Sequence, residues 1–422
     1  MTMVQPTHIS LEQIGYQARL ATGVLMATPV GVIDQALNDL ADTLMAEAQV
    51  CLDENKKDVL SAQNKKLSPA LIDRLTLNLD RISAMAGAMR EVATLADPCG
   101  LILDEWQRPN GLFFQKISVP IGVLGMIYES RPNVTLDSAS LCLKSRNAII
   151  LRGGSDSLHS SGYLVGLIRG VLKKHGLPED AVQMAPTQDR DFVGEMLKAN
   201  GVIDVMIPRG GKELTARVLR EATMPVFAHL DGNCHIYVHA SAKPDMAVQV
   251  ILNAKLRRTG ICGAAESLLF DQNLPQATAQ RIISALLDRG CDVAGDTPTQ
   301  FLDLRVTPAT DDDWGSEYLS AKISCKYVAD VHEAIHHINR YGSHHTDSIL
   351  AEDPEAVALF LMHVDSAIVM HNTSTQFADG GEFGMGAEIG IGTGKLHARG
   401  PVGLYQLTTF KYVVRGQGQV RA

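Results

Sequence analysis

Residues 123–154 read VLGMIYESRPNVTLDSASLCLKSRNAIILRGG and contain two apolar runs, Val123–Tyr128 and Ala148–Leu151, on either side of a helical segment at 135–145. Short apolar runs separated by a helix are typical of parallel strands joined by crossover connections. The same alternation predicts strands at Ala181–Ala185, Ile203–Ile207, Pro225–Ala228 and His235–Val238, and helices at 156–174, 189–199 and 211–221. We therefore predict an α/β fold in which helices cover both faces of a parallel sheet.

Two of the predicted strand-to-helix turns carry the same Arg-Gly-Gly sequence. Free backbone N–H groups and the helix dipole favour an anion at such a turn, and ligands bind at the carboxyl ends of parallel strands. We predict that one turn holds the adenosine ribose of a dinucleotide and the other its pyrophosphate, and that an arginine at the ribose turn favours NADP. Alternatively, both are tight turns with solvated arginines, because neither matches the G-x-G-x-x-G fingerprint. The residues concerned are Arg152, Gly153, Gly154, Ser155, Arg209, Gly210, Gly211 and Lys212.

The remaining segments extend this pattern in both directions. Residues from about 8 to 95 are predicted to be helical, and Pro-Asn-Gly at 109–111 predicts a hairpin over 105–117. A second α/β unit is predicted by strands at Ala321–Tyr327, Ser348–Ala351 and Ser366–Met370 and helices at Pro275–Arg289 and His332–Asn339. The glycine-rich segment Gly380–Gly403 predicts a long functional loop, and 404–414 an extended tail.

Cys262 lies between Gly260 and Gly263, just after Lys255, Arg257 and Arg258. Flanking glycines allow close approach of a substrate. Nearby cations, together with a helix predicted at 264–270, would favour the reactive thiolate. The sequence therefore indicates a nucleophile, with a buried structural cysteine as the competing interpretation.

Composition limits the classes of partner. The chain has 422 residues and a formal net charge of −9, which argues against nucleic acid or an anionic membrane as the main partner. Its seven cysteines are scattered, which fits a reducing compartment better than a disulfide scaffold. The start of the sequence lacks a basic segment before an apolar core, and the uncharged run Ala21–Ile33 is too short to span a bilayer. We expect a cytoplasmic protein.

His332-Glu333-Ala334-Ile335-His336 matches the H-E-x-x-H zinc motif on a predicted helix. The longer form of the motif fails at Asn339, and acidic neighbours favour an exposed face. We interpret this match as accidental, and the pairs His336-His337 and His344-His345 as polar surface. A cysteine hydrolase is a further alternative, although it would not explain the two Arg-Gly-Gly turns.

Seven blocks in one order identify a resemblance over nearly the whole length to the γ-glutamyl phosphate reductases of the aldehyde dehydrogenase superfamily. They are VPIGV at 119–123, YESRPNVT at 128–135, ILRGG at 150–154, GNCHIYV at 232–238, RTGIC at 258–262, YGSHHTD at 341–347, and GAEIGI at 386–391 with LHARGP at 396–401. The resemblance implies a Rossmann-like cofactor domain, an α/β catalytic domain carrying the cysteine, and a small oligomerisation ribbon. We expect the cofactor domain at 1–104 and 119–238, with 372–398 returning to it, the catalytic domain at 239–371, and the ribbon at 105–118 and 399–422.

The resemblance also implies roles for single residues. It makes Cys262 the nucleophile, Asn133 an oxyanion donor and Glu317 the ligand of the nicotinamide ribose. The implied reaction is the NADPH-dependent reduction of L-glutamyl 5-phosphate to L-glutamate 5-semialdehyde through a cysteine thioester, the second step of proline biosynthesis. We expect no metal, a homo-oligomer, and glutamate 5-kinase as a candidate partner. Cations for the substrate are expected among Arg131, Arg258, His397 and Arg399.

Two segments depart from the superfamily pattern. The water-activating glutamate of oxidising members is missing at His229-Leu230-Asp231-Gly232, as expected for an enzyme that must keep its thioester away from water. Gly381-Glu382 stands where related reductases more often carry an aromatic residue. A CoA-acylating aldehyde dehydrogenase would share the cysteine and the missing base, and a non-catalytic protein would share only the fold.

Overall fold

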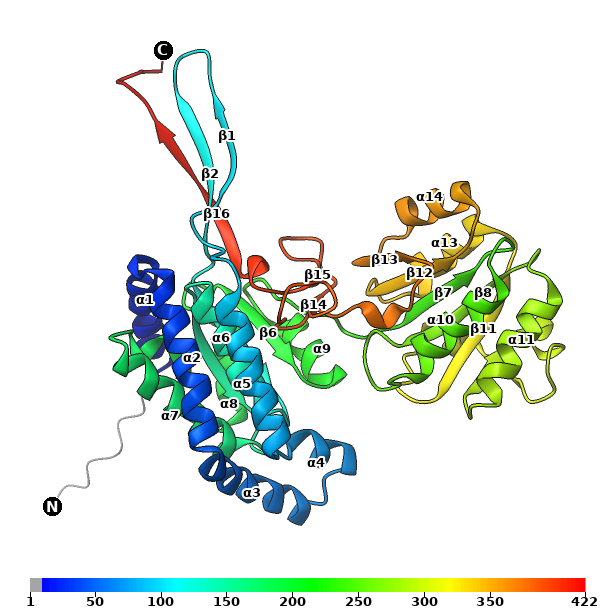
Figure 1. Ribbon diagram of the computed structural model, residues 1–422, viewed down its shortest axis with the longest axis horizontal. Helices are drawn as coiled ribbons and strands as arrows, with labels where there is room; N and C mark the ends of the chain where they lie inside the picture. The colour runs from blue at the N-terminus through cyan, green and yellow to red at the C-terminus, as the bar shows by residue number, and fades with distance from the viewer. Residues whose placement is uncertain (1–9, 422) are drawn as a thin grey trace. The chain divides into compact units, whose positions relative to one another are not determined.

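A computed structural model describes residues 10–421 (Figure 1). By its internal contacts the chain divides into two compact units. The first holds the chain up to Ala228, together with Met385–Gly390 and the chain from Val402 onward, and the second holds His229–Gly384 and Ile391–Pro401.

The first unit begins with five helices, whose apolar residues recur at helical spacing. In α2, for example, Ile33, Leu37, Leu40 and Leu44 are all buried, three or four residues apart. The helices are α1 (Leu11–Ala27), α2 (Val30–Ala46), α3 (Ala48–Asn64), α4 (Pro69–Leu75) and α5 (Leu79–Thr94). Among the described residues, no single helix is long and apolar enough to cross a membrane.

A four-stranded parallel sheet in the order β5-β4-β3-β6 forms the centre of this unit. Strands β3 and β4 are fully buried, which explains their continuous apolar sequences. The strands are β3 (Val123–Tyr128), β4 (Ala148–Gly153), β5 (Val182–Met184) and β6 (Val205–Arg209), and the helices between and after them are α6 (Asn133–Lys144), α7 (Leu158–Lys174), α8 (Arg190–Lys198) and α9 (Lys212–Glu221), with a 3-10 turn at Glu179–Ala181. The predicted alternation is confirmed here, except that 225–228 forms only an isolated bridge from Val226 to Met206.

The predicted hairpin forms a three-stranded antiparallel ribbon with the tail of the chain. Strands β1 (Ile102–Gln107) and β2 (Phe113–Pro120) pair with each other, and β16 (Thr408–Arg415) pairs with β2 along its length. Trp106 stacks on Phe114 and meets Tyr412 edge to face, at centroid distances of 5.3 Å and 6.0 Å. Cross-strand aromatic pairs of this kind stabilise a ribbon that has no core of its own.

The second unit contains a seven-stranded sheet in the order β10-β9-β11-β8-β7-β12-β13, parallel throughout. Its strands are β7 (Cys234–Val238), β8 (Ala265–Asp271), β9 (Asp292–Gly295), β10 (Thr307–Pro308), β11 (Lys322–Val328), β12 (Thr346–Leu350) and β13 (Ile368–His371). Its helices are α10 (Pro244–Leu256), α11 (Gln276–Leu287), α12 (Thr297–Gln300), α13 (Val331–Tyr341) and α14 (Pro354–His363), with 3-10 turns at Asp311–Gly315 and Thr375–Phe377 and a short pair, β14 (Ile391–Gly392) and β15 (Gly400–Pro401).

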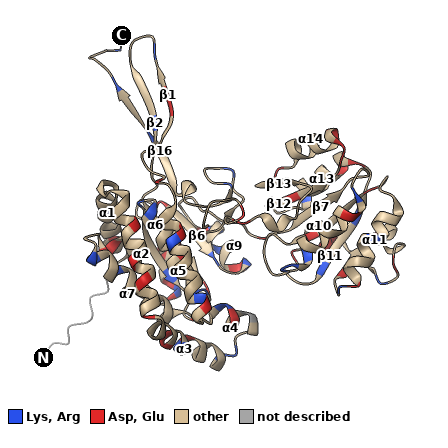
Figure 2. Ribbon diagram, in the orientation of Figure 1, with Lys and Arg blue, Asp and Glu red and all other residues tan. Residues whose placement is uncertain are grey.

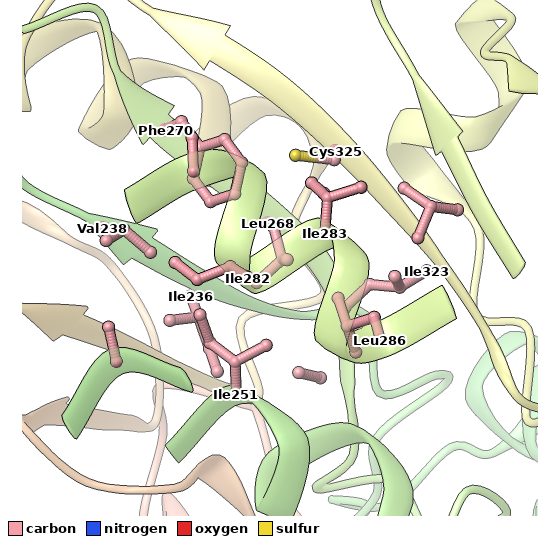
Figure 3. Close-up of a cluster of buried hydrophobic side chains, with 14 of the residues drawn as sticks. Ile236, Val238, Ile251, Leu268, Phe270, Ile282, Ile283, Leu286, Ile323 and Cys325 are labelled. Carbon is pink, nitrogen blue, oxygen red and sulfur yellow. The ribbon is translucent and has the colours of Figure 1, made fainter. Parts of the chain in front are cut away.

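Alternate residues of this sheet belong to different cores. Ile236 and Val238 of β7 pack with α10 and α11 in the cluster of Figure 3, whereas Tyr237 packs with α13 and α14. Side chains of a strand point to opposite faces in turn, so both faces are covered. Acidic and basic residues are scattered over both units in Figure 2.

The boundary between the units lies earlier than the sequence suggested. We expected β7 to end the cofactor domain at 238, but β7 pairs with β8 and β12 and belongs to the second sheet. The division therefore falls between Ala228 and His229. A short apolar run does not indicate which sheet it will join, because pairing partners lie far away in the sequence.

Candidate active site

Cys262 lies on the short connection between α10 and β8, in a turn closed by the Ala264 N–H donating to the Ile261 carbonyl at 3.0 Å. Its side chain is half-buried. The prediction of a helix after the cysteine is wrong, since residues 265–271 form the fully buried strand β8. No helix begins directly after Cys262, so the reactivity of the thiol must come from its other neighbours.

The three cations predicted beside the thiol are not equivalent. Lys255 is completely buried and donates to the equally buried Glu266 at 2.5 Å. Burial raises the pKa of Glu266 to about 7, although Lys255 opposes this shift. Arg257 and Arg258 are exposed. Gln376 holds the end of α10 and the residues after it by donating to the carbonyls of Ala254 and Arg258 at 2.8 Å and 3.3 Å. Only the two arginines remain available to an anionic ligand.

Gly232 lets a second segment pack directly against the cysteine backbone. A Cβ atom at Gly232 would lie 2.6 Å from the Cα atom of Cys262, closer than real contacts allow. The Gly232 N–H donates to the carboxylate of Glu317 at 2.9 Å. On the other side, the buried Cys234 thiol donates to the Cys262 carbonyl at 3.1 Å. The cysteine loop is therefore held by backbone contacts that admit no larger residue at 232.

Two histidines lie beside the cysteine, and neither was predicted to be a site residue. The side-chain ligand atoms of His229, His345 and Cys262 all lie within 4.8 Å of one another. His229 donates from Nδ1 to the Ile391 carbonyl at 2.9 Å, and its ring meets that of His345 edge to face at 5.0 Å. His345 is fully buried, and burial lowers its pKa to about 3.

The interpretation of the histidine pairs as polar surface is wrong for three of the four residues. His337 and His345 are buried, and His344 is half-buried with its Nδ1 atom 2.5 Å from the Asp365 carbonyl. His332 and His336, which form the H-E-x-x-H match, are exposed on α13 as expected. No spacing rule could have joined residues 229, 262 and 345.

In the first unit, the two Arg-Gly-Gly turns follow β4 and β6, on either side of β3. Strand order reverses between β3 and β6, the usual ligand position of open α/β sheets. Glu129, at the end of β3, accepts the Gly211 N–H at 3.2 Å at the start of α9. A Cβ atom at Gly210 would lie 2.6 Å from the Glu129 carboxylate. A larger residue at 210 would therefore have to displace the Glu129 side chain from this turn.

Arg152 differs from the solvated arginine of the alternative interpretation. Its buried guanidinium donates to the carbonyls of Gly153 and Gln188 at 3.1 Å and 2.9 Å. Burial lowers its pKa, and the charges of Arg190 and Arg217 lower it further. Arg190 is exposed at the start of α8 and was not predicted. Arg190 therefore lies close enough to Arg152, at the end of β4, for its charge to act on it.

Two comparisons decide the family. The aldehyde dehydrogenase family model matches residues 28–296. The chain is also 53% identical over 411 residues to a gamma-glutamyl phosphate reductase from Paramagnetospirillum magneticum, covering 97% of both chains. The chain belongs to the gamma-glutamyl phosphate reductases of the aldehyde dehydrogenase family. A relative of the same description from Parvibaculum lavamentivorans is 53% identical and covers 99% of both chains.

A solved structure gives the same result for the fold. The gamma-glutamyl phosphate reductase of Thermotoga maritima superimposes with a TM-score of 0.95 at 43% identity, covering 98% of this chain and 100% of that one. The aldehyde-dehydrogenase-like fold inferred from the sequence motifs is therefore confirmed.

The segment His229–Gly232 packs against the cysteine loop. The residue of this segment that lies on the cysteine backbone is a glycine. The nearby Glu317 carboxylate accepts the Gly232 N–H. This segment thus supplies backbone packing and a histidine beside the cysteine.

The residues expected to bind the substrate lie in different parts of the reductase. Arg399 donates to the backbone and side-chain oxygens of Asp365 at 3.1 Å and 2.9 Å. Lys395 also pairs with Asp365 at 2.5 Å, and both cations hold the pKa of this carboxyl below its usual range, Lys395 the more strongly. His397 is exposed on the same loop, with a φ of 67°. Non-glycine residues with positive φ cluster at functional sites.

Asn133 and Arg131 lie in the first unit, at the start of α6. Asn133 Nδ2 donates to Asp137 at 2.9 Å. Burial raises the pKa of Asp137 to about 6. A side-chain amide carries two N–H donors, so this hydrogen bond orients the group and leaves the second donor for another acceptor. The preceding Ser130 has a φ of 47° and donates to Asp156, which fixes the turn that carries Arg131.

Proposed function

We propose that this chain reduces L-glutamyl 5-phosphate to L-glutamate 5-semialdehyde and phosphate with NADPH, through a thioester on Cys262, as the second step of proline biosynthesis. The observation that carries the proposal is the half-buried cysteine packed against Gly232, in a chain 53% identical over nearly full length to reductases of that name. The aldehyde dehydrogenase family uses nicotinamide cofactors.

The proposed chemistry begins with the Cys262 thiolate attacking the γ-carbonyl carbon. A C–S bond forms, and negative charge develops on the carbonyl oxygen, where N–H donors stabilise it; the Asn133 amide and the Cys262 backbone N–H are the proposed donors. One such donor is typically worth about 3–4 kcal/mol of barrier. The tetrahedral species expels phosphate and leaves an acyl group on the sulfur.

The nicotinamide cofactor, when bound, supplies a hydride to the thioester carbon. The resulting thiohemiacetal loses the sulfur, which regains its thiolate, and the semialdehyde departs. The segment His229–Gly232 carries no glutamate, so we propose that it lacks the base with which oxidising relatives activate water against the thioester. Resolution by hydride instead of hydroxide is what distinguishes a reductase from an oxidising relative.

The residues of the first unit fit NADP. The α9 N-terminus and the Arg209–Lys212 turn suit a pyrophosphate, and the Arg152–Ser155 turn with Arg190 suits a phosphorylated ribose. In the second unit, Glu317 is the proposed partner of the nicotinamide ribose. The proposed partners of the substrate's phosphate and α-carboxylate are Arg131, Arg258, His397 and Arg399.

Replacing Arg190 with alanine tests the proposed NADP preference. We expect the KM for NADPH to rise about 10- to 100-fold, because a charge-assisted hydrogen bond contributes roughly 1.5–3 kcal/mol. The KM for NADH should change little. Arg220→Ala is the control, since Arg220 is exposed at the end of α9 and paired with Glu221. Equal effects on both cofactors would contradict a role at the 2′-phosphate.

The ribbon provides a surface for a second copy of this chain. Phe410, Tyr412 and Val414 lie on one face of β16 and are 44%, 57% and 47% exposed. We expect Tyr412→Glu with Val414→Glu to convert the oligomer into smaller species, measured by light scattering after gel filtration. Lys411→Glu, on the alternate face of the strand, should not. An unchanged mass in the double variant would show that the copies associate elsewhere.

Phosphate-dependent reduction of NADP⁺ with glutamate 5-semialdehyde, the reverse reaction, tests the whole proposal. We expect product formation that requires inorganic phosphate and is not supported by CoA. A requirement for CoA in place of phosphate would instead assign the chain to acyl-CoA chemistry.

A further inference from the structure

We propose that Cys262, His229 and His345 form a binding site for a thiophilic divalent cation, Zn²⁺, and that the bound ion reversibly blocks the cysteine. Within residues 10–421, these three side chains form a group whose ligand atoms lie close enough together to hold one ion. The metal-binding part of the proposal stands on geometry alone. The blocking part rests on the proposed role of Cys262 as nucleophile.

The distances fit a tetrahedral ion after a small adjustment. Zn–N bonds of about 2.0–2.1 Å and a Zn–S bond of about 2.3 Å place tetrahedral ligand atoms roughly 3.3–3.7 Å apart. The three ligand atoms already lie within 4.8 Å of one another. Side-chain rotations that move the ligand atoms by roughly 1 Å therefore complete the site, with no rearrangement of β8 and β12, the strands that follow Cys262 and His345.

The tautomer of His229 is set by its backbone partner. Its Nδ1 atom lies 2.9 Å from the Ile391 carbonyl, which can only accept a hydrogen bond. The neutral ring therefore carries its proton on Nδ1 and its lone pair on Nε2. Metal-binding histidines are commonly oriented in this way, by a second hydrogen bond to a carbonyl or carboxylate.

His345 provides independent support, because one of its ring nitrogens is buried without a hydrogen-bond partner. Its Nδ1 atom lies 2.9 Å from the Thr346 hydroxyl, whereas Nε2 has no partner among the described residues. A buried, unsatisfied polar atom costs roughly 1–3 kcal/mol. Coordination of a metal ion would satisfy this nitrogen.

The ligand set selects the ion. One thiolate and two imidazoles suit Zn²⁺, and three protein ligands leave a fourth position for water. Cys262 is half-buried, so the ion can reach it from solvent. Binding exchanges the thiol proton for the metal: the S–H bond breaks, an S–Zn bond forms, and one proton is released. A sulfur engaged in this bond cannot attack an acyl phosphate, and a chelator restores it.

The test uses Co²⁺ as a spectroscopic probe of the full-length chain. We expect a thiolate-to-Co²⁺ charge-transfer band in the near ultraviolet, displaced by Zn²⁺ and absent from Cys262→Ser. His345→Asn and His229→Asn should each weaken Zn²⁺ binding by about 10- to 100-fold or more. Loss of a residue that only orients a metal ligand already weakens metal binding by about that factor. His229 is only half-buried, so His229→Asn can still test the site if the buried His345 proves necessary for folding.

A matched control separates this site from surface histidines. His332→Asn with His336→Asn removes the exposed H-E-x-x-H pair and should leave the band and the zinc affinity unchanged. In the wild type, buffered Zn²⁺ should inhibit NADPH oxidation, and a chelator should reverse the inhibition. No cobalt band, or unchanged zinc affinity in both single histidine variants, would overturn the proposal. Bound metal without inhibition would refute only the block and the nucleophile role on which it rests.

Discussion

Cys262→Ser is expected to lower the rate of both the reduction and its phosphate-dependent reverse by about 10⁴-fold or more. Removal of a nucleophile typically leaves only the contribution of binding and oxyanion stabilisation. A serine hydroxyl is far less acidic than a thiol, so it forms the attacking anion much less readily. The measurement is kcat for NADPH oxidation with L-glutamyl 5-phosphate, and for NADP⁺ reduction in reverse.

Cys99→Ser is the matched control, because Cys99 is a partly exposed thiol in the first unit whose Sγ donates to the Ser145 carbonyl at 3.4 Å. Burial raises the pKa of Cys99, so this thiol stays protonated. The control should retain nearly full activity. Appreciable turnover by Cys262→Ser at unchanged fold would refute the thioester route, and circular dichroism of both variants shows whether the fold is unchanged.

The elements of the first sheet could be predicted because each strand is a continuous apolar run ending at a marked turn. Val123–Tyr128 and Ala148–Gly153 are buried on both faces, and Arg-Gly-Gly marks two of the strand ends. The same property explains the main error. The run at 264–270 was interpreted as a helix, and periodicity cannot separate a strand buried on both faces from a buried helix.

The candidate site was predictable where chemistry is local and unpredictable where it depends on pairing between distant strands. Cys262 stands out by its flanking glycines and by the motif that carries the family resemblance. His345 reaches the same point only because β12 pairs with β7, which in turn pairs with β8, the strand that follows the cysteine. Arg190 joins Arg152 for a similar reason, since β5 pairs with β4. The spacing of residues in the sequence does not indicate which strands will pair.

Lys255→Met is expected to reduce the free energy of unfolding by about 3–5 kcal/mol, because it leaves the carboxylate of Glu266 without its partner in a site that excludes water. Both side chains are fully buried, and the Nζ–Oε2 distance is 2.5 Å. Glu266 also accepts the Leu319 N–H at 3.3 Å, which only partly compensates a negative charge. Thermal or urea unfolding of the second unit measures the loss.

The expected loss depends on pH with a definite sign. Burial raises the pKa of Glu266 to about 7 even with Lys255 present, and removal of that cation raises it further. A carboxyl whose pKa is higher in the folded state than in the unfolded state favours folding below its unfolded pKa, near 4.5, and this contribution is lost as pH rises through the folded pKa. The single variant should therefore be least stable at alkaline pH and should recover part of the loss on acidification.

The double variant Lys255→Met with Glu266→Gln distinguishes a structural ion pair from a catalytic one. Removing both charges leaves no uncompensated ion, so the double variant should regain much of the stability lost in Lys255→Met, and the two changes should be strongly non-additive. Lys243→Met is the surface control, because its pair with Glu352 is exposed and should contribute less than about 1 kcal/mol. If the double variant is stable but the KM for the acyl phosphate rises sharply, Lys255 acts on the substrate as well as on Glu266. If KM is unchanged, the positive charge near the cysteine that serves the reaction comes from the exposed arginines that follow α10.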